Sequence, residues 1–303
     1  MGSSKKSFEP VNGIILLNKE DGLSSNRALQ NVKKLIGAKK GGHGGSLDPA
    51  ATGMLILCFG EATKICPYLL NNTKTYRVIA ELGKSTTTGD REGEVIETSD
   101  IHVFDDDCWV GILEKFLGES TQIPPMYSAL KKDGQRLYKL ARKGEVIQRD
   151  ARKINILSIK LENTENNSIE FLVTVSKGTY IRVLVEDIAK AAGMVGYTKM
   201  LHRVGVGNFK EIQMLSYESI ETSIASKKAE FKDYLLPVDS ALSDWSSIQL
   251  DQEQLAMFLN GRSIKVTSSS RGLIRVYDNE EKFIGIGELN EDYFLMPRRL
   301  FHL

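Results

Sequence analysis

Residues 41–53 of the chain read GGHGGSLDPAATG, a glycine-rich loop that holds one histidine, His43, and one aspartate, Asp48. Glycine lets the backbone approach a ligand closely, and Pro49 favours an extended conformation for Asp48, which disfavours a helix there. The apolar run MLILCF at 54–59 follows directly and is typical of a buried strand. Asp-Pro also occurs in plain turns and helix caps. A catalytic role for Asp48 is the alternative to such a structural role, because a carboxylate on a constrained loop beside a core strand is a common arrangement for a catalytic acid.

A longer stretch supports the catalytic alternative. Residues 42–64, GHGGSLDPAATGMLILCFGEATK, resemble the signature GHTGTLDPxATGxLxxxxGxATK of the TruB family, the bacterial tRNA pseudouridine-55 synthases. The chain departs from it at Gly44 and Ser46, where threonine is usual. Further motifs of the family are matched by KTY at 74–76, TTTGDREG at 86–93, QIPPMYSA at 122–129, SKGTYIR at 176–182 and LHR at 201–203. The resemblance covers residues 13 to about 240.

Bulk composition limits the class of protein. The chain has 303 residues, 41% of them hydrophobic, which suffices for one large domain or one large and one small domain. Its 40 basic and 39 acidic residues are nearly balanced, so any nucleic-acid surface must be a local patch. The three cysteines, Cys58, Cys66 and Cys108, show no spacing typical of a disulfide framework or a zinc site. Without a signal sequence or a membrane-spanning run, we expect a cytoplasmic protein.

Hydrophobic periodicity predicts the main elements of the first 240 residues. Strands are expected at 13–17, 54–59, 74–82, 154–161 and 169–175. Helices are expected from Ser24 or Ser25 to Gly37, from 107 to 117, from 137 to Gly144, and through 184–189 to Gly193. In the strand at 74–82, Tyr76 belongs to the apolar face, which without the resemblance indicates an ordinary core tyrosine.

The resemblance implies an α+β fold with a large mixed, mainly antiparallel β-sheet, flanking helices and an active cleft across the sheet. The catalytic domain would span residues 10–246, and a small β-rich domain similar to the PUA domain would span 247–303. Within the second unit we expect a helix at 251–259 and strands at 262–266, 273–277, 283–288 and 293–296.

One window of the chain is strongly basic. Residues 131–153 contain nine basic and three acidic residues, a net charge of +6, whereas residues 251–303 contain seven basic and eight acidic residues. Such a run is compatible with an ordinary solvated helix face. The resemblance instead implies an insertion at about 124–153 that grips the tRNA. The candidate RNA contacts are Lys131, Lys132, Arg136, Lys139, Arg142 and Lys143.

The resemblance also assigns roles within the pocket. Pseudouridine formation breaks the C1′–N1 bond of uridine, turns the base and joins C5 to C1′, so it needs no redox cofactor, and the chain has no metal-site spacing. Asp48 would be the catalytic carboxylate and Arg182 the cation that keeps it charged. The flipped base would contact Tyr76, and the remaining substrate contacts would be His43, Tyr180, Leu201 and Lys19.

Other functions compete with this prediction. They are a guide-RNA-dependent relative, a tRNA-binding or folding protein without catalysis, and a glycoside hydrolase that pairs Asp48 with Asp21 or Asp90. We expect the stand-alone enzyme, a monomer that acts on the T stem-loop of tRNA without an obligatory protein partner. An ionised Asp48 near the ribose serves attack at C1′, addition at C6 and proton abstraction at C2′ alike, so the sequence leaves the mechanism open.

Overall fold

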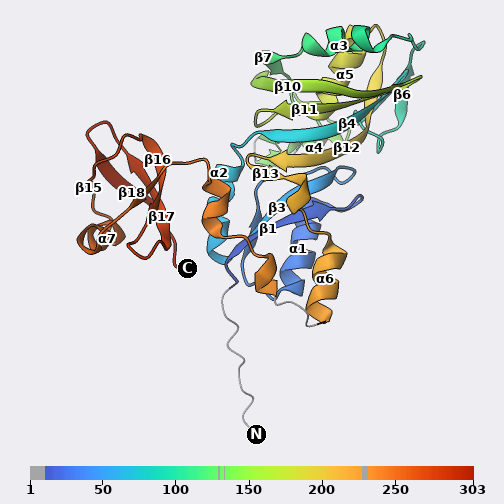
Figure 1. Cartoon of the computed structure of the whole chain (residues 1–303). Helices are drawn as coiled ribbons and strands as arrows, with labels where there is room; N and C mark the ends of the chain where they lie inside the picture. Colours follow the sequence, from blue (N-terminus) through green and yellow to red (C-terminus); the bar gives the residue numbers. More distant parts are fainter. Residues whose placement is uncertain (1–10, 129, 133, 227–230) are drawn as a thin grey trace.

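A computed structural model describes residues 11–128, 130–132, 134–226 and 231–303, with only the backbone described for Lys131, Lys132 and Phe231. Within these ranges, nine strands form a large sheet and five form a smaller C-terminal sheet. Figure 1 shows the small sheet, in orange and red, to one side of the large one. No helix of the described segments is long and apolar enough to cross a membrane. The predicted α+β architecture is confirmed.

The large sheet has the strand order β1-β3-β12-β4-β11-β10-β7, with β2 beside β3 and β13 beside β12. The pair β3–β12 is parallel and the other pairs are antiparallel. The strands are β1 (Gly13–Lys19), β2 (Gly41–His43), β3 (Thr52–Phe59), β4 (Lys74–Leu82), β7 (Gly118–Gln122), β10 (Arg152–Glu165), β11 (Ser168–Val175), β12 (Gly196–Val206) and β13 (Phe209–Lys210).

Strand β4 follows the predicted alternation at every position. Its residues alternate between buried and half-buried, and Tyr76, Val78 and Ala80 lie on the buried face. That face packs on helix α5 (Ile181–Ala191), whose Leu184 and Val185 belong to the same core cluster. A period of two residues therefore sets the register that brings the sheet against the helix.

The helices cover the sheet in two groups. Helix α1 (Ser25–Leu35) begins at the N-cap Ser24, as predicted, and packs with α6 (Tyr217–Ala225) on β1 and β3 (Figure 1). Helix α3 (Asp106–Glu114) packs with α5 near the other end of the sheet. The remaining short elements are η1 (Gly60–Ile65), α2 (Cys66–Leu69), β5 (Lys84–Thr86), β6 (Val95–Thr98), β8 (Lys131–Lys132), β9 (Gln135–Arg136), α4 (Leu137–Ala141), η2 (Glu211–Gln213), η3 (Phe231–Tyr234) and η4 (Val238–Leu242).

Some elements differ from the prediction. The helix expected at 107–117 ends at Glu114, and the polar strand β7 begins at Gly118. Strand β7 lacks apolar residues and is held by pairing with β10 at the sheet edge. The central strand β12 was not predicted, because glycines and the buried polar residues Thr198 and Arg203 interrupt its apolar pattern.

The C-terminal unit contains five strands and one helix within residues 247–303. They are β14 (Ser247–Gln249), α7 (Gln252–Leu259), β15 (Ile264–Lys265), β16 (Gly272–Tyr277), β17 (Phe283–Leu289) and β18 (Phe294–Leu300). Phe283 and Phe301 pack in one cluster with Ile14 and Met54 of the large sheet. The domain boundary between residues 246 and 247 stays a prediction, because this cluster joins the two units, and residue 10 lies outside the described residues.

Candidate active site

Hydrogen bonds from two distant elements shape the loop that carries Asp48. The Ser25 hydroxyl of α1 accepts from Leu47 N at 2.7 Å and donates to Leu47 O at 3.0 Å. From β12, Arg203 donates to Met54 O at 2.6 Å and to Gly45 O at 3.1 Å. Arg203 is only 2% exposed, so these bonds are shielded from water. The loop is thus fixed on both sides of Asp48.

The parallel pairing of β3 with β12 requires a glycine at position 53. Gly53 has φ of 93°, and a Cβ there would lie 2.4 Å from the backbone oxygen of Arg203. Any larger residue would push β12 away and shift Arg203 with it. Gly53 therefore keeps the loop and its support together.

Arg182 joins four segments at one guanidinium group. It lies in the first turn of α5, is 5% exposed, and donates from Nη1 to Thr88 O at 2.8 Å and from Nη2 to Tyr127 O at 2.7 Å. Its Nη2 lies 3.1 Å from Asp48 Oδ2, and its Nη1 lies 3.7 Å from Asp90 Oδ2. The predicted pair of Asp48 and Arg182 is thus brought together, with Asp90 as a second carboxylate.

Opposing influences act on the pKa of Asp48. Removal from water is the largest and raises this pKa, the Arg182 guanidinium lowers it, and the charge of Asp90 raises it again. The side chain keeps 45% of its surface open, although protein surrounds the carboxyl group on most sides. The guanidinium therefore offsets much of the cost of holding an ionised carboxylate here.

A cavity of about 860 Å³ opens in front of Asp48. The predicted residues His43, Arg182, Arg136 and Arg142 line it together with Asp48. Its other lining residues are Ser24, Ser25, Asn26, Ser46, Leu47, Pro49, Thr88, Asp90, Glu92, Tyr127, Ser128 and Tyr138. The volume lies within the range of small-molecule sites and is ample for a nucleotide.

His43 stands in the cavity wall, and burial followed by the charge of Arg203 lowers its pKa. Its Nδ1 is buried and lacks a hydrogen-bond partner among the residues described. The lowered pKa favours the neutral imidazole, in which one ring nitrogen is a donor and the other an acceptor.

The other predicted base contacts surround the loop. Tyr76 is 9% exposed and packs in the core cluster with Leu47 and Ala51, on both sides of Asp48. Leu201 lines a small hollow with Asp48 and Arg182. Tyr180 is extended at the N-cap of α5, and the Gln122 side chain clamps its backbone N and O at 2.7 and 3.1 Å.

The position of Lys19 differs from the prediction that this residue contacts substrate. Its side chain is fully buried, and Nζ donates to Glu20 O, Leu23 O and Pro49 O at 2.7, 2.7 and 3.0 Å. Burial lowers its pKa to about 8. Lys19 therefore supports the Asp48 loop from beneath instead of contacting substrate, since carbonyl groups take up its three donors.

The predicted RNA contacts divide between two hollows. Arg136 and Arg142 line the cavity of Asp48, and Arg136 also lines a neighbouring hollow of about 470 Å³ with Lys139 and Lys143. The side chains of Lys131 and Lys132 lie outside the described residues.

Sequence reasoning gave no role to Arg203, considered Asp90 only as the second acid of a glycoside hydrolase, and considered Ser25 only as a possible helix cap. Asp90 is 7% exposed and accepts from Thr88 Oγ1 at 2.5 Å and from Glu92 N at 3.0 Å. Asp90 and Arg203 stand within matched motifs, and that was their only sequence signal. Their proximity to Asp48 and its loop, like that of Ser25, follows only from the fold.

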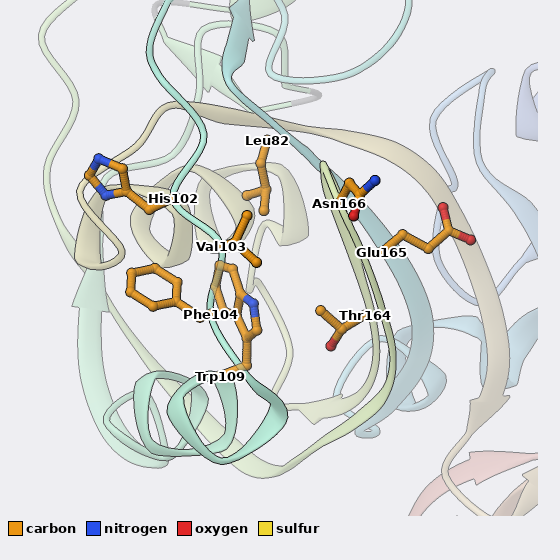
Figure 2. Close-up of a pocket in the computed structure, with 8 residues that line it drawn as sticks. All are labelled: Leu82, His102, Val103, Phe104, Trp109, Thr164, Glu165 and Asn166. Atoms are coloured by element: carbon orange, nitrogen blue, oxygen red, sulfur yellow. The ribbon is translucent and has the colours of Figure 1, made fainter.

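A further cavity of about 140 Å³ lies apart from these residues (Figure 2). Leu82, Thr164 and an edge-to-face set of His102, Phe104 and Trp109 line it. Across the described part of the chain, no group of three or more His, Cys, Asp or Glu side chains is arranged to hold a metal ion.

Comparison with solved structures supports the fold. The chain superposes with a TM-score of 0.76 on a chain in the crystal structure of a Cbf5-Nop10-Gar1 complex, over 96% of this chain and 85% of that one. The two are 22% identical in sequence, so this likeness concerns the fold alone.

Sequence comparisons are closer and span the whole chain. The N-terminal domain of the TruB family pseudouridylate synthases matches residues 33–181, the C-terminal domain of tRNA pseudouridylate synthase B matches 182–243, and the C-terminal region of pseudouridine synthase II TruB matches 246–301. The tRNA pseudouridine synthase B of Pseudomonas fluorescens is 47% identical over 99% of both chains. That of Pseudomonas putida is 46% identical with the same coverage. The chain belongs to the TruB family of pseudouridylate synthases.

Proposed function

We propose that the protein converts uridine 55 in the T loop of tRNA to pseudouridine. The observation that carries the proposal is the Asp48 carboxylate, open to a cavity of about 860 Å³ and 3.1 Å from the Arg182 guanidinium. Relatives that are 46–47% identical over nearly the whole chain are named tRNA pseudouridine synthase B. Position 55 and the residue roles below are part of the proposal.

Asp48 acts on the ribose or the base, and Arg182 keeps it ionised. Burial raises the pKa of the carboxyl group and the guanidinium lowers it, so Arg182 offsets part of the cost of the charge. Arg182 is itself held by the backbone oxygens of Thr88 and Tyr127, which limits the rotation of its planar fork. Attack at C1′, addition at C6 and removal of the C2′ proton all use this ionised group.

The base reaches Asp48 by leaving the RNA stack, because the C1′–N1 bond is not accessible within it. His43 lines the space that the flipped nucleotide enters, and Leu201 lines the hollow beside Asp48 and Arg182. The Tyr180 hydroxyl is close enough to Asp48 and Arg182 for their charges to act on its pKa. Tyr76 presents an aromatic surface to the base and is 9% exposed in the absence of RNA. Its use as a stacking surface requires a small opening around the loop.

The arginines on one wall of the cavity bind the RNA backbone. Arg136 and Arg142 line the same hollow as Asp48, and the guanidinium of Arg142 lies 5.7 Å from the centre of the Tyr138 ring. Together with Lys139 and Lys143 they form a basic rim on which phosphates of the tRNA arm lie.

A stand-alone enzyme is favoured over a guide-RNA-dependent one. The full-length relatives named tRNA pseudouridine synthase B are about twice as identical to the chain as the Cbf5 chain is, at 47% against 22%. The expected monomer without an obligatory protein partner and the cytoplasmic location stay predictions.

A glycoside hydrolase requires a second carboxyl group that is free to protonate a leaving group. Asp90 is committed to Thr88, to Glu92 N and to Arg182, and only 10% of its side chain is exposed. Asp21 pairs with Arg91 at an exposed position. Neither suits the second role.

The test is incubation of the protein with an unmodified tRNA transcript, followed by mapping of pseudouridine at single-nucleotide resolution. We expect one pseudouridine at position 55 and none in a transcript that carries cytidine there. A transcript that stays unmodified while the protein binds it would favour the non-catalytic tRNA-binding function.

A further inference from the structure

Two cysteine sulfurs lie together behind the loop that holds His43. Cys58 in β3 pairs directly with Gly42 of β2. Directly opposed residues of an antiparallel pair point to the same face of the sheet, with Cβ atoms about 4.5–5.5 Å apart. A Cβ on Gly42 would lie 3.1 Å from Sγ of Cys66. The Cys66 sulfur therefore fills the space that Gly42 leaves beside Cys58.

The two thiols differ in the way that a redox pair requires. Cys58 is fully buried, whereas Cys66 is only partly buried at the start of α2. A hydrogen bond between the thiols lowers the pKa of Cys66, with a further contribution from the charge of Lys40, and raises the pKa of Cys58. Cys66 is thus the less buried cysteine and the one whose lowered pKa favours the thiolate, and Cys58 is the fully buried thiol next to it.

Helix α2 contacts both glycines that flank His43. Its first residue, Cys66, lies against Gly42, and its last, Leu69, would lie 2.8 Å from a Cβ on Gly44. His43 between them lines the cavity of Asp48. A shift of Cys66 therefore moves the support of the His43 loop directly.

We propose that Cys58 and Cys66 are a peroxide-sensitive pair that closes to a disulfide and slows the reaction at Asp48. The S–S bond shortens the distance between the sulfurs to about 2.05 Å, below their distance as hydrogen-bonded thiols. Closure pulls α2 toward β3 and displaces the loop at 42–44. The effect on the reaction rests on the proposed function, whereas the formation of the disulfide does not.

The chemistry balances with hydrogen peroxide as the oxidant. The Cys66 thiolate attacks one oxygen of peroxide, which gives a sulfenic acid at Cys66 and releases hydroxide. The Cys58 sulfur then attacks the sulfenic sulfur, the S–O bond breaks, and the departing hydroxide takes the Cys58 proton as water. Overall, two thiols and one peroxide give one disulfide and two waters.

The sequence makes the bond easy to detect. Trypsin cleavage after Lys40, Lys64 and Lys74 puts Cys58 in peptide 41–64 and Cys66 in peptide 65–74. A Cys108→Ser background removes the exposed third thiol. After treatment with peroxide and blocking of free thiols, we expect the two peptides to run as one linked species that lacks two hydrogen atoms and separates with dithiothreitol. Two unlinked peptides, with free or over-oxidised Cys66, would overturn the proposal.

The second readout is the rate of pseudouridine formation at enzyme excess. We expect oxidation of the Cys108→Ser protein to slow it about tenfold, within the range expected for misplacement of a site by about 1 Å, and dithiothreitol to restore it. Cys66→Ser in the same background should be unaffected by peroxide. A linked peptide with an unchanged rate would overturn the coupling to the His43 loop, whereas an enzyme that is inactive before treatment would refute the proposed function alone.

Discussion

Replacement of Arg182 by lysine tests the arrangement around Asp48. The guanidinium binds Thr88 O and Tyr127 O at 2.8 and 2.7 Å while its Nη2 lies 3.1 Å from Asp48. An ammonium group keeps the charge but carries it on one nitrogen, which cannot occupy the positions of both Nη1 and Nη2, so at least one of these contacts is lost. Hydrogen bonds to charged groups contribute about 1.5–3 kcal/mol each. A loss of about 3 kcal/mol slows the reaction roughly 100-fold, at 1.36 kcal/mol for each factor of ten.

The assay is single-turnover conversion of a tRNA transcript with enzyme in excess, together with tRNA binding and circular dichroism. Arg77→Lys is the matched control, because Arg77 is 35% exposed, pairs with Glu162, Glu170 and Glu211, and does not line the cavity. Exposed ion pairs contribute about 0.2–1 kcal/mol, so the control should fall less than about fivefold. If Arg182→Lys is no slower than this control, the guanidinium does not orient Asp48.

Three further predictions concern RNA affinity, pH and loop support. Neutralisation of four basic residues to glutamine should flatten the slope of log affinity for tRNA against log salt concentration by up to roughly 1 unit per lost phosphate contact. The four residues are Arg136, Lys139, Arg142 and Lys143. An unchanged slope would contradict their role. Because burial raises the pKa of Asp48, the single-turnover rate should begin to fall on acidification at a pH above the pKa of a free aspartate, about 3.9. A rate that falls only at or below about pH 3.9 would contradict this. Lys19→Met should lower the melting temperature, since three part-buried carbonyls lose a hydrogen bond to a charged group, each worth about 1.5–3 kcal/mol, and an unchanged melting temperature would contradict its supporting role.

Deletion of the C-terminal unit would not isolate its contribution to RNA affinity. Phe283 and Phe301 complete a core cluster with Ile14 and Met54. A chain that ends near residue 247 would expose that cluster, so a change in its RNA affinity would mix folding with binding. Charge-removing substitutions at the exposed Arg262 and Lys265 keep the cluster and isolate the electrostatic contribution of this unit.

The spacing of apolar residues in the sequence predicted the strands and helices in which buried and exposed residues alternate regularly. The strand at 74–82 was predicted with its full bounds, because its alternation matches a sheet with one face in the core. Strand β12 was missed, since no apolar pattern records the burial of its polar residues. Arg203 is buried with its guanidinium bonded to Met54 O, and Thr198 is buried with its backbone N bonded to Gly89 O. Pairing with β10 likewise created β7 from a polar segment.

The candidate site was predictable only in part. The resemblance pointed to Asp48 and Arg182, and the structure places them 3.1 Å apart. It also pointed to Lys19, whose buried ammonium binds carbonyls beneath the loop. A sequence does not show whether a side chain faces a cavity or the backbone behind it, and Asp90 approaches Arg182 only through the fold.

The most direct test of the central claim is single-turnover formation of pseudouridine by Asp48→Asn, measured beside tRNA binding. Asparagine keeps the shape of the side chain and removes the ionised group on which the proposed reaction depends. We expect Asp48→Asn to retain tRNA binding and to form no pseudouridine above the background of a reaction without enzyme. Substantial conversion by Asp48→Asn would contradict it and would assign the chemistry to another residue of the cavity.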